Sequence, residues 1–161
     1  MLDLSSSRKG AVAEAEIAAA AIRLDLVVLR PLCEGGRYDL VIDIGLRMLR
    51  VQCKWASRRD DVLTVRCVTS RHTPAGYRRS IYSADEIDAI AAYAADTDSC
   101  LLLRIDEIEG RKDVRLRLGP TRNNQCTGVR WARDYEFGAS LRRHWGVETR
   151  SSPVEPHPPT R

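Results

Sequence analysis

Two stretches decide the fold, Tyr38-Asp39-Leu40-Val41-Ile42-Asp43-Ile44 and, after a glycine turn, Met48-Leu49-Arg50-Val51-Gln52-Cys53-Lys54-Trp55-Ala56. Both alternate between polar and apolar residues with a period of two, which predicts two β-strands joined by a tight turn. The alternation places Asp39 on one face of the first strand. It places Gln52 and Lys54 together on one face of the second. Antiparallel pairing through the turn would bring these three side chains together.

Upstream, Ser5-Ser6-Ser7 offers N-caps for an alanine-rich helix over residues 8–23. At ~100° per residue, Glu14 falls beside Ile17 and Ala21 on the packing side, whereas Glu16 falls on the opposite side. A carboxylate at the margin of a packing face is uncommon unless it is paired or bound to a metal. Glu14 is therefore a candidate partner for the strand residues.

Three of these side chains, together with a backbone carbonyl, suit a hard metal ion. Mg²⁺ prefers oxygen ligands and keeps several waters, so Glu14, Asp39, the Gln52 amide oxygen and the backbone carbonyl of Cys53 form a sufficient set. Lys54 would then stand beside an attacking water or a phosphate. Each residue also has an ordinary interpretation: Asp39 as a residue that starts a strand, Lys54 as a solvated strand lysine, and Glu14 as a surface glutamate.

The remaining pattern predicts a mixed α/β domain over residues 1–146, arranged as a helix, an antiparallel meander, a second helix and further strands. We expect a short buried strand at 26–29, a third meander strand at 62–69 after a polar turn at 57–61, and a helix opening at the Ser83–Glu86 capping box. Further strands are expected at 100–105 and 114–118, and a final helix within 131–144. The proline-rich tail, 147–161, is predicted to be disordered.

Composition limits the function classes. The chain has 161 residues, a net charge of +4 and 26 basic side chains, of which only Lys9, Lys54 and Lys112 are lysines. Arginine suits phosphate oxygens, although a GC-rich genome would produce the same bias. The five cysteines lack zinc spacing. No membrane-spanning stretch or signal peptide is present, so we expect no membrane partner and a cytoplasmic location.

A basic segment between residues 70 and 81 has no regular apolar pattern and is predicted to be a loop. It is the candidate for phosphate contacts, through Arg71, His72, Arg78 and Arg79. Arg58 and Arg59, at the tip of the meander, are the second candidate. The alternative is that the loop is simply solvated.

The residues around these positions resemble PD-(D/E)XK endonucleases, in particular the group that includes intron-encoded homing enzymes. The resemblance covers residues 8–138, and it is carried by Arg8-Lys9-Gly10 with Glu14, Arg30-Pro31-Leu32, Gly36-Arg37-Tyr38-Asp39-Leu40, Arg50-Val51-Gln52-Cys53-Lys54-Trp55, Tyr82-Ser83-Ala84-Asp85-Glu86-Ile87-Asp88 and Gly128-Val129-Arg130-Trp131-Ala132-Arg133-Asp134-Tyr135-Glu136-Phe137. Two positions depart from the family pattern. Tyr38 stands where a proline often precedes the aspartate, and Gln52 stands where Asp or Glu is usual.

The resemblance implies roles and an activity. Glu14 and Asp39 match the metal ligands, Gln52 the third ligand position, and Lys54 the catalytic lysine. It implies a nuclease that uses Mg²⁺ or Mn²⁺ and acts on double-stranded DNA as a homo-oligomer, a dimer or a tetramer. Because Gln52 lowers the negative charge of the site, weaker metal binding is expected. Two alternatives stay open, a Holliday-junction resolvase and a relic that only binds DNA.

Overall fold

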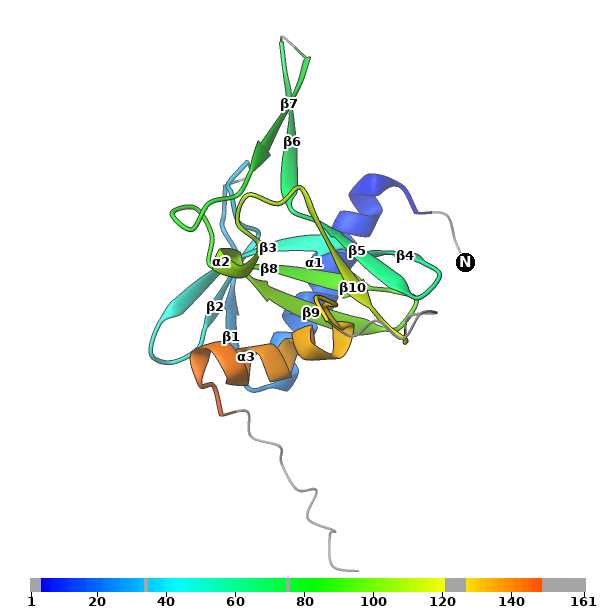
Figure 1. Ribbon diagram of the computed structural model, residues 1–161. Coiled ribbons are helices and arrows are strands. Elements are labelled where there is room, and N and C mark those ends of the chain that lie inside the picture. The colour runs from blue at the N-terminus through cyan, green and yellow to red at the C-terminus, as the bar shows by residue number, and fades with distance from the viewer. Residues whose placement is uncertain (1–3, 34, 75, 121–126, 149–161) are drawn as a thin grey trace, which may run out of the picture.

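The computed structural model describes residues 4–33, 35–74, 76–120 and 127–148 (Figure 1). Its centre is a five-stranded sheet in the order β1 (Val27–Leu29), β2 (Leu40–Asp43), β3 (Met48–Trp55), β8 (Ala89–Ala94) and β9 (Ser99–Arg104). A three-stranded sheet follows the order β10 (Asp113–Arg117), β5 (Val62–Arg66) and β4 (Ser57–Arg59), and β6 (Val68–Thr73) pairs with β7 (Gly76–Ile81). The helices are α1 (Ser6–Arg23), α2 (Ile105–Ile108), the 3₁₀ turn η1 (Ala132–Tyr135) and α3 (Phe137–Trp145). The mixed α/β fold is confirmed.

The predicted pair of strands forms the middle of the central sheet. β2 and β3 are antiparallel, with Leu40 opposite Val51 and Ile42 opposite Leu49. On its other side β3 pairs with β8 in parallel, with Gln52 opposite Ile90. β3 is therefore an interior strand with a partner on each side, which fixes its backbone firmly.

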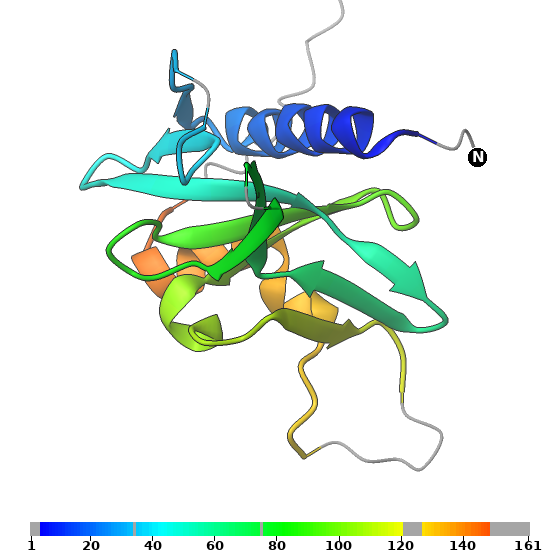
Figure 2. The ribbon, with the colours of Figure 1, turned by 90° about the horizontal axis from the view of Figure 1, so that it is seen from above.

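Helix α1 ends at Arg23 as predicted and begins two residues earlier than predicted, at Ser6, and it lies across the central sheet (Figure 2). The Ser5 side chain accepts a hydrogen bond from the Arg8 amide at 3.4 Å, as expected of an N-cap. Ala13, Ile17 and Ala21 form its fully buried stripe against β2 and β3. This packing fixes the direction in which the margin of the helix, including Glu14, points.

The opposite side of the sheet packs against the small sheet and α2. Leu63 and Val65 of β5 and Leu116 of β10 share one apolar cluster with alternate residues of β8 and β9. Helix α3 packs beside β9, where the buried hydroxyl of Ser140 donates to the Leu102 carbonyl at 2.8 Å. The candidate site residues lie on α1, just before β2 and on β3, and Lys54 of β3 lines a hollow together with Arg66 of β5.

The predicted helix from Ser83 is wrong. The Glu86 carboxylate does accept a hydrogen bond from the Ser83 amide at 3.1 Å, so the capping-box contact forms, but only a turn follows. All six residues of β8 are buried, between β3 and β9. A strand buried on both faces shows a continuous apolar run, and such a run cannot be told from a buried helix by periodicity.

The three-stranded meander is also wrong in part. β2 and β3 pair as predicted, but β5 leaves the central sheet and pairs with β4 and β10 instead. The predicted polar turn at 57–61 contains the short strand β4, which carries the chain from one sheet to the other. β1 was expected to be buried, yet it is an edge strand in which Val27 is 62% exposed.

The basic segment forms the β6–β7 hairpin rather than a loop, and it projects from the body of the molecule (Figure 1). Gly76, with φ of +104°, lies at its tip in a conformation that favours glycine. The sequence of this segment has no apolar alternation, so its pattern could not indicate the hairpin.

The C-terminal region is close to its prediction. The final helix is divided at Glu136, whose carboxylate caps α3 by accepting from the Ala139 amide at 2.7 Å. Val147 is buried, one residue past the expected domain boundary, and the predicted disordered tail from 149 onward lies outside the described residues. Among the helices described, none is long and apolar enough to cross a membrane.

Candidate active site

Asp39 lies immediately before β2, where its backbone amide donates to the Val51 carbonyl at 3.0 Å. Its carboxylate turns toward β3, and Oδ2 accepts a hydrogen bond from the Cys53 amide at 2.7 Å. The same oxygen accepts from Nε2 of Gln52. The predicted meeting of Asp39 with the polar face of β3 is thus observed, and it depends on the β2–β3 register.

Gln52 is buried, with only 8% of its surface exposed. Besides its bond to Asp39, its Nε2 lies 3.4 Å from the carbonyl oxygen of Cys53. One amide nitrogen therefore sits between two oxygens that the sequence marks as metal ligands. Reversing the terminal amide would present the Gln52 oxygen in place of this nitrogen.

Glu14 approaches from α1, and its Oε2 accepts a hydrogen bond from Arg30 at 2.9 Å. Burial, followed by the negative charge of Asp39, raises the pKa of Glu14 above its ordinary value, and Arg30 only partly opposes this. The influence of Asp39 on Glu14 indicates that the two carboxylates belong to one site. Arg30, 72% exposed, was not selected from the sequence as a site residue.

Burial also raises the pKa of Asp39, outweighing the Cys53 amide and the charges of Lys54 and Arg30. For both carboxylates burial is the largest cause of the raised pKa, and the positive charges nearby offset it only in part. The Cys53 thiol has a strongly raised pKa because it is buried and faces the same carboxylates, so it stays neutral and serves as a packing group.

Lys54 is held by an aromatic group that sequence reasoning did not assign to the site. Its Nζ donates to the hydroxyl of Tyr82 at 3.1 Å, and Tyr82 is only 2% exposed. The guanidinium of Arg37 lies 4.7 Å from the centre of the same ring and pairs with Glu86 at 2.7 Å. Tyr82 comes at the start of one of the strings that carry the family resemblance, Tyr82-Ser83-Ala84-Asp85-Glu86, but nothing local marks it as a partner of Lys54.

The donor set fits a hard divalent cation. The Asp39 carboxylate and the Cys53 carbonyl converge on one nitrogen, and Glu14 adds a second carboxylate, which pairs with Arg30 at 2.9 Å. Within the described residues no group of three or more His, Cys, Asp or Glu gathers to hold a metal. This is expected, because Gln52 holds the position where a third carboxylate would stand.

The candidate DNA contacts are distributed over two regions. Arg79 of β7 is exposed, while for Arg71, His72 and Arg78 the structure defines the backbone pairing, Arg71 with Arg78 and His72 with Tyr77. Arg58 and Arg59 are exposed on β4, and Nε of Arg58 donates to the Asp60 carbonyl at 2.8 Å.

The site combines a carboxylate from a helix, Glu14, with an aspartate just before a strand, Asp39, and with Gln52 and Lys54 on the next strand. This arrangement on a mixed sheet is expected of a nuclease that cleaves phosphodiester bonds. The chain belongs to the PD-(D/E)XK endonuclease family, whose sequence model matches residues 4–138.

The fold is similar to that of a bacterial homing endonuclease, I-Ssp6803I. The TM-score is 0.69 at 22% identity, over 86% of this chain and 93% of that one. At this identity the likeness speaks for the fold alone. Comparison with curated proteins gave no match.

Proposed function

We propose that this chain is a divalent-metal-dependent endonuclease that cuts double-stranded DNA at specific sites, in the manner of a homing enzyme, and that it acts in the cytoplasm. The observation that carries the proposal is the convergence of Asp39 Oδ2 and the Cys53 carbonyl on one nitrogen of Gln52, beside Glu14 and Lys54. Membership of an endonuclease family supports phosphodiester cleavage. The shared fold with a bacterial homing endonuclease is the reason for proposing a homing-type activity.

The metal would be held by Glu14, Asp39, the amide oxygen of Gln52 and the Cys53 carbonyl. When bound, Mg²⁺ or Mn²⁺ polarises the scissile phosphate and makes a bound water more acidic. Gln52 must then reverse its amide so that its oxygen, not its nitrogen, faces the cation. This reversal gives up the present hydrogen bond to Asp39, and with the missing third carboxylate it supports weaker metal binding.

The chain itself supplies two further actions. Lys54 places a positive charge beside the reacting phosphate, where it orients the attacking water or offsets the charge that grows on the phosphate oxygens. The hydroxyl of Tyr82 holds the lysine amine in one position, which favours the reactive geometry. Because one site cuts one strand, cleavage of a duplex requires two sites, and we propose a homo-oligomer.

The DNA interface is proposed to include the hairpin residues Arg71, His72, Arg78 and Arg79, with Arg58 and Arg59 as secondary contacts. Replacing Arg78 and Arg79 by alanine should weaken duplex binding and flatten its salt dependence. An unchanged salt slope would remove the hairpin from the interface.

The test is cleavage of a pool of linear duplex DNA, with four-way junctions in parallel, in Mg²⁺ and in EDTA. We expect metal-dependent cutting of linear DNA at a defined site, lost in Lys54→Ala and kept in Lys112→Ala, a change of an exposed lysine elsewhere. Cutting of junctions alone would select the resolvase activity. Tight binding without any cutting would select the DNA-binding relic, against which Glu14, Asp39 and Lys54 argue and which the glutamine at position 52 leaves open.

A further inference from the structure

A hollow of about 400 Å³ opens beside Lys54, between the start of α1, the end of β3 and the base of the β6–β7 hairpin. Its volume falls in the range of small-molecule sites, roughly 300–1,000 Å³. Trp55 forms one wall, and its ring is held edge-on against Tyr93 with 5.6 Å between the ring centres. The hollow is thus a defined space next to the candidate catalytic lysine.

The charged side chains that line this hollow are all positive. Lys9, Lys54, Arg66 and Arg79 line it, and none of the described lining residues is acidic. Arg66 and Arg79 have no ion-pair partner in the part of the chain that the structure describes. Because Arg66 and Arg79 line the same space without an acidic partner among the described residues, an anion bound between them would balance their charges.

Gly10 lies over this hollow on the packing side of α1. It continues the helical spacing of the buried residues Ala13 and Ile17, but a Cβ added at Gly10 would meet no atom within 4 Å. Glycine inside a helix costs about 1 kcal/mol relative to alanine. No contact requires glycine here, so this position leaves the hollow open at the expense of helix stability.

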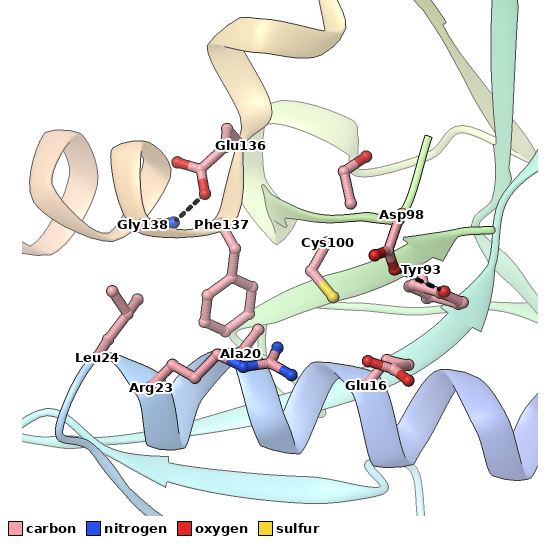
Figure 3. A pocket seen from close by; sticks show the side chains of 11 residues that line it. Glu16, Ala20, Arg23, Leu24, Tyr93, Asp98, Cys100, Glu136, Phe137 and Gly138 are labelled. Atoms are coloured by element: carbon pink, nitrogen blue, oxygen red, sulfur yellow. Dashed lines mark hydrogen bonds between the residues drawn. The ribbon is translucent and has the colours of Figure 1, made fainter. Parts of the chain in front are cut away.

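A second hollow of about 400 Å³ provides a contrast. It lies near the end of α1 and is lined by Glu16, Asp98 and Glu136 together with Arg23 (Figure 3). A phosphate placed there would face three carboxylates and one guanidinium. The two hollows have similar volumes and opposite charge, so only the first suits a polyanion.

We propose that the basic hollow binds a phosphodiester of the DNA strand next to the scissile one, with Arg66 and Lys9 as contacts. This rests on the proposed function, because the hollow shares Lys54 with the candidate catalytic site. A bound flanking phosphate would hold the strand so that the scissile phosphate meets Lys54 and the carboxylates. The hollow is therefore a positioning subsite for the substrate strand.

The first test compares Arg66→Ala with Arg115→Ala. Both arginines are exposed and lie on the paired strands β5 and β10, but only Arg66 lines the hollow. Binding to a plain duplex is measured in EDTA over a range of salt concentrations. Losing one phosphate contact should lower the slope of log K against log salt by about 0.9 for Arg66→Ala and leave it unchanged for Arg115→Ala.

The second test uses the glycine. Gly10→Ala should raise the melting temperature by about 2–4 °C and bind DNA as the natural chain does. Gly10→Met keeps the helix-forming tendency but extends into the hollow, and it should weaken duplex binding about tenfold at an unchanged melting temperature or a higher one. The alanine variant controls for the loss of glycine itself.

Failure of the two proposals is distinguishable. If the chain cuts DNA but Arg66→Ala keeps the full salt slope and Gly10→Met binds normally, the hollow is not a phosphate subsite and the nuclease assignment stands. If the slope falls as expected but no DNA is ever cut, the subsite stands and the nuclease assignment fails. A third outcome is that inorganic phosphate shifts the Gly10 amide resonance while Arg66→Ala leaves the salt dependence of DNA binding unchanged. The hollow then binds a free anion, and this proposal is overturned.

Discussion

Two aspartates occupy equivalent places on the two sides of β3 and have opposite surroundings. Asp39 immediately precedes β2, Asp88 immediately precedes β8, and each carboxylate accepts a β3 amide, from Cys53 at 2.7 Å and from Arg50 at 2.8 Å. Each also donates its own amide to a β3 carbonyl. The backbone geometry is shared, so the difference between them comes from the side chains.

Asp88 is surrounded by positive charge. Arg50 donates to it at 3.1 Å and Arg47 at 2.9 Å, and these bonds lower its pKa although burial alone would raise it. Asp39 has no lysine or arginine within 4 Å among the described residues, and its pKa is raised. A carboxylate with balanced charge stabilises the sheet, whereas one left unbalanced is available to a cation.

The largest expected effect is on catalysis. Asp39→Asn keeps a hydrogen-bond acceptor for the Cys53 amide but removes the charge that would hold the metal. We expect cleavage to fall by about a thousandfold or more, with a melting temperature that is unchanged or higher. Undiminished cleavage by this variant in Mg²⁺ would contradict the assignment of Asp39 as a metal ligand. Asp88→Asn is the matched control and should retain the specific activity of its folded fraction.

The second effect is on stability. Asp88→Asn leaves Arg47 and Arg50 without the carboxylate that they share. The Asp88 side chain is only 14% exposed. We expect a loss of about 2 kcal/mol in the free energy of unfolding, measured by urea titration. Equal stability of Asp88→Asn and the natural chain would show that the arginine pairs are not structural.

The sequence predicts most of the surroundings of Asp39 and little of the surroundings of Asp88. The alternation in residues 38–56 gave the β2–β3 pair and placed Asp39 by Gln52, because both depend on local periodicity. Asp88 was assigned to a helix, since a strand buried on both faces has no alternation. The contact of Tyr82 with Lys54 and the salt bridge between Arg30 and Glu14 are set by tertiary packing. No local pattern reports them.

The contributions of the two aspartates to stability should change with pH in opposite directions. The raised pKa of Asp39 means that it contributes stability below its unfolded pKa and loses it as pH rises through the folded pKa. The lowered pKa of Asp88 means that it contributes above its unfolded pKa and loses this as pH falls through the folded pKa. From about pH 3 to pH 7, Asp39→Asn should therefore gain on the natural chain as pH rises, and Asp88→Asn should fall behind. Parallel profiles from thermal unfolding would contradict the comparison.

Gln52 is a position at which a further negative charge can be placed beside Asp39. Gln52→Glu adds a third carboxylate, so it should raise Mg²⁺ affinity about tenfold and lower stability in the absence of metal. Calorimetric titration with Mg²⁺ measures the first effect and thermal unfolding in EDTA the second. If the glutamate leaves Mg²⁺ affinity unchanged, Gln52 does not face the cation.

The smallest effect is expected at Tyr82, which links the active-site side of β3 to Arg37. Tyr82→Phe keeps the buried ring and its contact with the guanidinium but removes the hydroxyl that accepts from Lys54. Because the lysine charge remains, the rate constant for cleavage should fall only about three- to tenfold, with DNA affinity unchanged. Tyr93→Phe removes a hydroxyl that contacts Asp98 at 2.9 Å in the acidic hollow, and it should change neither. An equal loss in both variants would indicate a general effect on folding, whereas a loss confined to Tyr82→Phe shows that the position of Lys54 matters as well as its charge.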